Sequence, residues 1–178
     1  MAAIDLIVLG MIKEHPQSAY ELQKSVEYRN ISRWVKISTP SIYKKVVQLE
    51  QKGYISGRTI KEGNMPEKSI YSITESGEAY FDKLMEKTSR ESVSIFLNFN
   101  AVVMNLNFVT EEERIRLLCN IADGIEDLKE TIGKNQQKPQ EIPLTGRTIL
   151  KQQARLAEVL EQWVLEFTKE YTEDEKGR

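Results

Sequence analysis

The sequence contains very few of the side chains that carry nucleophilic or metal chemistry, with one cysteine and one histidine among 178 residues. The single cysteine, Cys119, excludes an intramolecular disulfide framework and fits a reducing cytoplasm. His15 lies beside Pro16 in an expected turn, and no glycine-rich phosphate loop, HExxH or GxSxG pattern occurs. We therefore expect no enzyme, no metal site and no cofactor. Cys119, beside an apolar helical stripe, is expected to be a small core residue.

Long apolar runs are also absent, and none approaches the roughly 18–20 residues that a membrane span requires. The N-terminal run MAAIDLIVLGMIKEH has no preceding basic residue and is interrupted by Asp5, so a signal peptide is not expected. With 40% hydrophobic and 29% charged residues, the composition is that of a globular protein rather than a disordered one. These features predict a cytoplasmic protein that does not bind membranes.

Acidic side chains are missing from residues 28–49, where five basic residues occur. A phosphate-binding surface needs such a gap, because a nearby carboxylate would repel the nucleic-acid backbone. Residues 1–80 carry 11 basic and 9 acidic side chains, whereas residues 81–178 carry 14 and 18. A mildly basic front half and an acidic back half suit a nucleic-acid-binding module joined to a second domain.

The segment TPSIYKKVVQLEQKG, residues 39–53, predicts a short helix at the centre of the first module. Thr39 can cap its N-terminus, Pro40 suits the first helical position, and Gly53 suits a left-handed residue at the C-terminus. The apolar residues at helical spacing on its expected buried face are Ile42, Val46 and Leu49.

The opposite face of this helix is expected to be polar and basic. Its side chains are of the types that reach phosphates and base edges from a helix in the major groove. They are Ser41, Lys44, Lys45 and Gln48. Because an isolated lysine pair is more often only a solvated helix face, the surrounding elements decide the interpretation.

Two predicted helices precede this central helix, and a predicted β-hairpin follows it. Residues 3–14 and 18–28 predict two helices, the second opened by a capping box of Ser18 and Glu21. After Gly53 the apolar period changes to about two, and residues 54–60 and 68–73 predict a β-hairpin whose loop carries the turn residues Gly63, Asn64 and Pro66. Three helices followed by a two-stranded wing is the winged helix-turn-helix arrangement. The fold class is therefore predicted to be mainly α.

Four segments in order, LIVLGMI, SAYEL, SIYKKVVQLEQKGYI and IYSITESG, resemble the PadR family of bacterial transcriptional regulators along residues 4–80. The chain departs from that family at Ser18-Ala19, where His-Gly is frequent. It also departs at Glu67-Lys68-Ser69, where an Arg/Lys cluster is frequent, and this thins the charge of the wing. The resemblance implies a DNA-binding regulator with its recognition helix within residues 39–53.

We expect double-stranded DNA to be contacted by the recognition helix, by the loop before it and by the wing. The expected contact residues are Arg33, Lys36, Thr39, Ser41, Tyr43, Lys44, Lys45, Gln48, Lys61 and Lys68. The alternative is a winged-helix module that binds protein, since a fold does not define a function. The two readings differ in salt dependence, because phosphate binding weakens steeply as ionic strength rises.

The second domain, residues 81–178, is expected to be helical. A helix is predicted over about 75–89, and the apolar segment 92–108 is expected to be helical because it is long and lacks glycine and proline. Thr110 and Glu113 make a second capping box for a helix to about residue 131. A polar linker is predicted at about 133–146, followed by a helix over about 146–173.

This last helix carries an apolar heptad stripe too short for an independent coiled coil, so a second copy of the chain is the expected partner. The expected dimerisation residues are Phe96, Phe99, Leu156, Leu160, Trp163 and Phe167. The domain resembles the C-terminal domain of virulence-activator-type PadR relatives, which implies a homodimer on a pseudo-palindromic operator, with repression favoured over activation. Some relatives bind phenolic acids or flat aromatic drugs. Phe96, Phe99, Trp163 and Phe167 are candidates to line such an effector pocket, with ordinary dimer core as the alternative reading.

Overall fold

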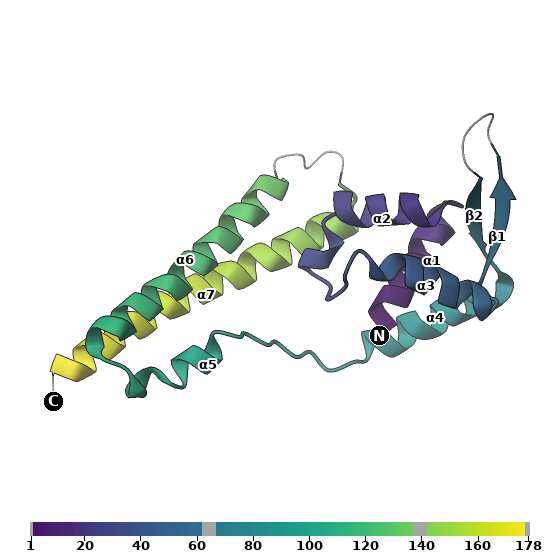
Figure 1. Ribbon diagram of the computed structural model, residues 1–178. Helices are drawn as coiled ribbons and strands as arrows, with labels where there is room; N and C mark the ends of the chain where they lie inside the picture. Colours follow the sequence, from purple (N-terminus) through teal and green to yellow (C-terminus); the bar gives the residue numbers. More distant parts are fainter. Residues whose placement is uncertain (1, 62–66, 137–141, 177–178) are drawn as a thin grey trace. The chain divides into compact units, whose positions relative to one another are not determined.

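The computed structural model describes residues 2–61, 67–136 and 142–176, and the chain divides into two compact units, Met1–Val93 and Ser94–Arg178. The first unit contains, in chain order, α1 (Ala2–Glu14), α2 (Ala19–Tyr28), the short 3₁₀ helix η1 (Ile31–Arg33), α3 (Ser41–Gln51), β1 (Ile55–Ile60), β2 (Lys68–Ile73) and α4 (Glu75–Ser89). The fold is mainly helical with a two-stranded wing, as the sequence predicts (Figure 1).

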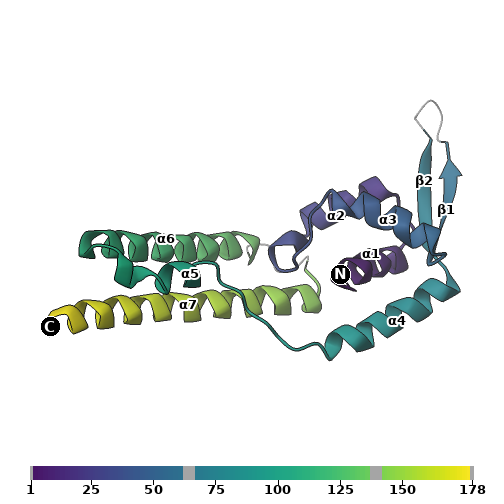
Figure 2. The same ribbon diagram turned by 60° about the horizontal axis from the view of Figure 1, so that its bottom comes forward.

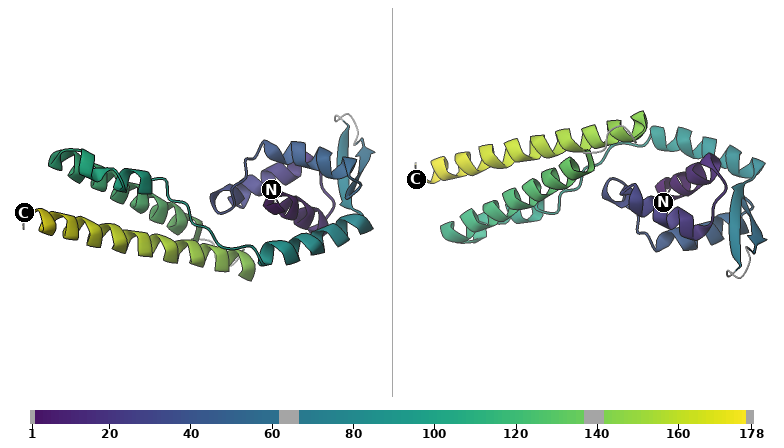
Figure 3. Two further views of the ribbon diagram at one scale, coloured as in Figure 1. Left: turned by 90° about the horizontal axis from the view of Figure 1, so that it is seen from below. Right: turned by 90° about the horizontal axis from the view of Figure 1, so that it is seen from above.

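The core of the first unit is formed where α1 lies between α3 and α4 (Figure 2 and Figure 3). The predicted inner face of α3 is buried, with Ile42 and Val46 at 0% exposure and Leu49 at 1%. Burial of one such side chain stabilises the fold by about 1.5–3 kcal/mol. Because Leu84 of α4 is also buried in this core, the unit extends past residue 80, where the sequence pattern ends the first domain.

The helix ends follow the sequence signals with one exception. The capping box of α2 is present: the backbone N–H of Ser18 donates to Glu21 at 2.7 Å, and that of Glu21 donates to the Ser18 hydroxyl at 3.3 Å. Gly53 follows α3 with φ +72°, as predicted. Thr39, however, does not cap α3. The helix begins at Ser41 without a side-chain cap, because the preceding residues form a turn in which the Ser41 hydroxyl donates to the Ser38 carbonyl.

The wing is an antiparallel pair in which Ile55 lies opposite Ile73 and Ile60 opposite Lys68. Its inner strand is also joined to the start of α2, since Gln17 and Tyr71 exchange both backbone hydrogen bonds at 3.2 and 3.0 Å. The turn predicted at residues 62–66 lies outside the described part of the chain.

The base of the wing accounts for the residues 73–77 that close the segment IYSITESG. Thr74 caps α4 by accepting from the backbone N–H of Gly77, and its hydroxyl donates to the Gly53 carbonyl at 2.7 Å. A Cβ on Gly77 would lie only 1.9 Å from the Tyr54 carbonyl oxygen. Glycine is therefore needed at this position so that α4 can approach the end of α3.

The second unit contains α5 (Asn100–Val103), the 3₁₀ helix η2 (Leu106–Phe108), α6 (Glu111–Gln136) and α7 (Leu144–Lys176). The long helices α6 and α7 run antiparallel side by side, with α5 alongside them (Figure 2). Their core includes Ile121, Ile125 and Val164. The predicted capping box opens α6, since the Glu113 carboxylate accepts from Thr110 at 3.1 Å and the Glu113 N–H donates back to the Thr110 hydroxyl at 3.3 Å.

Three expectations for this unit are wrong. Residues 92–97 are extended rather than helical, because serine and β-branched residues have weak helix propensity. The linker is shorter than 133–146, since α6 continues to Gln136 and α7 begins at Leu144; residues 137–141 lie outside the described part. Cys119 is exposed on α6 rather than packed in the core, because Leu118 and Ile121 occupy the inward positions around it.

Candidate nucleic-acid interface

The outer face of α3 carries exposed side chains of mixed character. Tyr43 is 43% exposed and Val47 48% exposed, and Lys44 is also exposed between them. Ser41 and Gln48 lie at the edge of this face and are half-buried. An exposed lysine flanked by an aromatic and an amide side chain can bind phosphate and base edges, the contacts that a recognition helix makes.

Lys45 does not belong to this face, and its predicted position there is wrong. Its Nζ lies 2.6 Å from Asp5 Oδ1, and the two side chains are only 13% and 8% exposed. The reason is helical spacing: position 45 follows Ile42 by three residues and precedes Leu49 by four, so its side chain leaves α3 on the buried side. Of the adjacent lysines, Lys44 points outward and Lys45 points into the protein.

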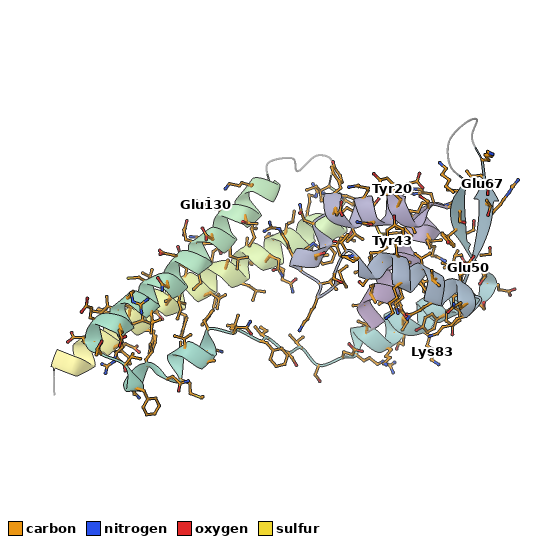
Figure 4. All side chains as sticks on the ribbon, in the orientation of Figure 1. Tyr20, Tyr43, Glu50, Glu67, Lys83 and Glu130 are labelled. Carbon is orange, nitrogen blue, oxygen red and sulfur yellow. The ribbon has the colours of Figure 1, made fainter. Side chains whose placement is uncertain are left out.

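The N-terminal half of α2 extends the exposed outer face of α3. The sequence patterns did not predict that α2 contributes to this face. Tyr20 is 60% exposed, and the Lys24 ammonium lies 5.7 Å from the centroid of its ring. Tyr20 on α2 and Tyr43 on α3 are neighbours in the side-chain view (Figure 4). The hydrogen bond to Glu27 is the main cause that raises the pKa of Lys24, and Tyr20 and Tyr43 add to it.

A sequence signal for this extension did exist. Leu22 and Val26 of α2 are fully buried and four residues apart, and Tyr20 and Lys24 show the same spacing on a different face. We define the α2–α3 face as the surface formed by these exposed residues of the two helices. Its members are Tyr20, Lys24, Tyr43, Lys44 and Val47.

The loop between α2 and α3 is anchored so that its basic residues remain exposed. Ile31 is buried at 5% exposure, and Trp34 packs against the core. Arg33 and Lys36 are both exposed, as predicted for groups that would meet phosphate. Thr39 is half-buried at the end of this loop.

The wing is fixed to α3 by a carboxylate. Glu50 Oε1 accepts a hydrogen bond from the Gly57 backbone N–H at 3.1 Å, and Glu50 lies at the wing end of α3 (Figure 4). Lys61 is exposed beside the tip. Lys68 is half-buried, and its charge is one of the smaller causes, after the hydrogen bonds from Ser18, that lower the pKa of Glu21. Of the two wing lysines, Lys61 is thus the one with an exposed side chain.

The residues predicted for dimerisation separate into two groups. Phe99, Trp163 and Phe167 stack in series, with ring centroids 5.4 and 5.6 Å apart. Phe96 is 88% exposed and Leu156 41% exposed. An apolar groove of about 480 Å³ lies beside the stack. It is lined by Leu97, Phe99, Val102, Leu117, Asn120, Ile121, Gly124, Ile125, Leu128 and Leu160.

Among the described residues, no three histidine, cysteine, aspartate or glutamate side chains gather as metal ligands would. Within the same residues, no helix has both the length and the apolar character to cross a membrane.

Three helices, a wing packed on the third helix and an exposed face on α2 and α3 that carries Lys24 and Lys44 define a protein of the winged helix-turn-helix class. Residues 8–83 match the family described as Transcriptional regulator PadR-like family. The match covers most of the first unit, which is therefore like that of PadR-type transcriptional regulators in sequence as well as in fold.

Solved structures share the fold over nearly the whole chain. The PadR of Bacillus subtilis in complex with operator DNA is 15% identical, with a TM-score of 0.77 over 93% of this chain and 97% of that one. The PadR-like regulator BC1756 from Bacillus cereus is 16% identical, with a TM-score of 0.74 over 96% and 99%. The Vibrio cholerae virulence activator AphA is 16% identical, with a TM-score of 0.69 over 95% and 98%.

Bacillus subtilis PadR is also similar in its complex with p-coumaric acid, at 14% identity and a TM-score of 0.72 over 92% of each chain. No curated protein matches the chain in sequence.

Proposed function

We propose that the protein is a cytoplasmic repressor that binds a pseudo-palindromic operator as a homodimer, with α3 in the major groove. The observation that carries this proposal is the α2–α3 face, which is exposed, contains Lys24 and Lys44, and continues into the exposed Arg33 and Lys36. The family match supports it, as does the likeness to the operator-bound PadR of Bacillus subtilis. The wing would lie along the backbone, with Arg58 and Lys61 as exposed cations.

The homodimer is supported by a second apolar stripe on α7. Ala157, Leu160 and Val164 pack toward α6, whereas Leu156 and Val159 beside them are 41% and 63% exposed. Apolar side chains gathered in this way mark an interaction surface. We infer that a second copy of the chain covers these exposed side chains of α7, because two-fold symmetry would also present two recognition helices to successive major grooves.

The test is selection of genomic DNA fragments by the purified protein, read by sequencing at low and at moderate salt. We expect a two-fold symmetric motif whose half-sites are about one helical turn apart. Retention should weaken steeply with salt, because each phosphate contact releases counterions. Absence of retention at low salt would overturn the proposal and favour the alternative, a winged-helix module that binds protein.

We also propose that the apolar groove of the second unit binds a small aromatic effector. Eight hydrophobic residues and a single amide, Asn120, line this open groove of about 480 Å³, which suits a planar molecule with one polar group. The complex of Bacillus subtilis PadR with p-coumaric acid supports this kind of ligand. Of the four aromatic residues predicted to line a pocket, Phe99 alone is part of this groove.

The groove is tested with p-coumaric acid as the probe and a variant that fills the space. A Cβ at Gly124 would meet no heavy atom within 4 Å, so Gly124→Leu should place its side chain in the groove without a clash. Calorimetry should show binding to the native protein and none to this variant, while DNA retention persists in both. Equal binding of p-coumaric acid to the native protein and to Gly124→Leu would show that the groove is not the effector site.

A further inference from the structure

The first unit contains a buried polar cluster that joins three helices. Asp5 of α1 is 6% exposed, and its two carboxylate oxygens have different partners. Oδ1 lies 2.6 Å from Lys45 Nζ of α3, and Oδ2 accepts a hydrogen bond from the Tyr80 hydroxyl of α4 at 3.1 Å. The carboxylate also lies in the first turn of α1, where the helix dipole favours a negative charge.

The cluster continues to the base of the wing. The rings of Tyr80 and Tyr54 stack with centroids 4.2 Å apart and planes 13° apart. Tyr54 directly precedes β1, and its carbonyl accepts the backbone N–H of Thr74 at 3.1 Å. Burial is the main cause that raises the pKa of Tyr80, and the hydrogen bond from Tyr80 to Asp5 raises it further. The Tyr80 hydroxyl therefore remains a protonated donor. A single series of contacts thus runs from α3 through Asp5 and Tyr80 to the wing.

We propose that Lys45 is a positioning residue: through Asp5 and Tyr80 it sets the orientation of α3 relative to the wing, and it does not itself bind DNA. The inference rests on the proposed DNA-binding function. The Lys45 and Asp5 side chains are largely buried, so an arrangement of the helices that separates them leaves a charge without its partner. The pair therefore favours the one arrangement in which the two charges meet. Apolar side chains at the same places would fill the space without fixing the angle of α3 by charge.

The adjacent lysines provide the test, because Lys44 is exposed and Lys45 is not. Affinity for the selected operator is measured against salt for Lys44→Met and Lys45→Met, at a temperature where circular dichroism shows both variants folded. We expect Lys44→Met to reduce the slope of log affinity against log salt by about 0.9. Lys45→Met should leave that slope unchanged and weaken binding about tenfold, since a recognition site tolerates only small displacements.

A rescue experiment separates positioning from contact. Lys45→Met and Asp5→Asn alone should each lower the folding equilibrium constant about 100-fold or more. The triple variant Asp5→Leu/Lys45→Met/Tyr80→Phe leaves no buried charge or hydroxyl unpaired, so it should recover stability. Its affinity should stay about tenfold below that of the native protein with an unchanged salt slope, because nothing then fixes the angle of α3. Because it folds even if Lys45→Met does not, the proposal remains testable. If Lys45 touched phosphate, the salt slope of the triple variant would be reduced, and if the ion pair were only structural, the triple variant would bind as tightly as the native protein.

Two other results would overturn the proposal. Reduced stability with unchanged affinity of the folded Lys45→Met protein would mean a purely structural ion pair. A reduced salt slope for Lys45→Met would make it a phosphate contact. Failure of the native protein to retain DNA would instead refute the proposed function, while the stability of the three variants would still report whether Asp5 and Lys45 are coupled.

Discussion

The two units differ in how completely they bury their apolar side chains. In the first unit, Val8, Leu22 and Ile42 are at 0% exposure, and polar contacts such as those of Asp5 and Gln17 are buried between elements. In the second unit, Val159 and Leu165 of α7 remain 63% and 64% exposed. The first unit closes a core of its own and exposes Tyr20, Tyr43 and Val47 on its α2–α3 face, whereas the second exposes apolar side chains along α7 that another molecule must cover. Changes in the first should therefore act on folding, and changes in the second on assembly.

The largest effect on folding is expected for Gly77→Ala. The new Cβ would lie 1.9 Å from the Tyr54 carbonyl oxygen, so α4 and the wing base must separate. We expect the free energy of unfolding to fall by about 3 kcal/mol or more. The chain has two tryptophans, Trp34 in the first unit and Trp163 in the second, so urea unfolding of a Trp163→Phe background reports on the first unit alone.

The matched control is Gly124→Ala in α6, followed in a Trp34→Phe background. No heavy atom lies within 4 Å of its added Cβ, so the change should stabilise α6 by up to about 1 kcal/mol. Similar destabilisation by the two substitutions would contradict the close approach at Gly77.

The next largest effect should come from charging the exposed stripe of α7. Leu156→Glu/Val159→Glu alters side chains that are exposed in one copy of the chain, so each unit should remain folded. Dimerisation should be lost, and affinity for a two-half-site operator should fall at least about 100-fold, because the second contact becomes intermolecular. Sedimentation velocity gives the mass, and Glu158→Gln between the two positions is the control. A charged variant that still sediments as a dimer would place the interface elsewhere.

Sequence patterns predicted the fold of the first unit because its helix caps, turn glycine and apolar stripe are local features of the sequence. The Ser18–Glu21 capping box, Gly53 and the stripe from Ile42 to Leu49 each act within one element, and each is confirmed. Lys45 was misplaced because its partner, Asp5, lies forty residues away in sequence, on α1. A lysine beside an apolar stripe is buried only if another element supplies a carboxylate.

The second unit was less predictable for a related physical reason. Segment 92–97, where the second unit begins, is rich in apolar residues, yet it is extended, and Phe96 is 88% exposed. Apolar composition alone does not distinguish a helix from an extended segment, and here the weak propensity of serine and valine prevailed. At the candidate site, Tyr20 was missed because its face of α2 depends on how α2 packs against α3.

A smaller difference between the units should appear in salt dependence. Lys44 of α3 and Lys151 of α7 are both exposed lysines on helices. Lys44→Ala should reduce the slope of log affinity against log salt by about 0.9 and weaken binding by about 1 kcal/mol, whereas Lys151→Ala should change neither. Fluorescence anisotropy with a labelled operator at several salt concentrations measures both. An equal response of the two variants would mean that binding senses only the net charge.

The smallest effects concern the two capping boxes, one in each unit. Hydrogen bonds from Ser18 lower the pKa of Glu21, and hydrogen bonds from Thr110 lower that of Glu113, below the ordinary value for glutamate. A carboxyl whose folded-state pKa is lowered contributes stability above its unfolded-state pKa, and this contribution is lost as the pH falls through the folded-state value. Both units should therefore lose stability in acid through these glutamates.

Glutamine can replace glutamate in a capping box but does not titrate. Glu21→Gln should flatten the acid-side loss of stability reported by Trp34, and Glu113→Gln should flatten that reported by Trp163, each measured by urea unfolding between pH 3 and pH 7. Because the Glu113 cap is fully exposed, its effect should be the smaller of the two and should diminish further in salt. If each substitution alters both tryptophan signals equally, the two units unfold together, and the closed first unit depends on the second for its stability.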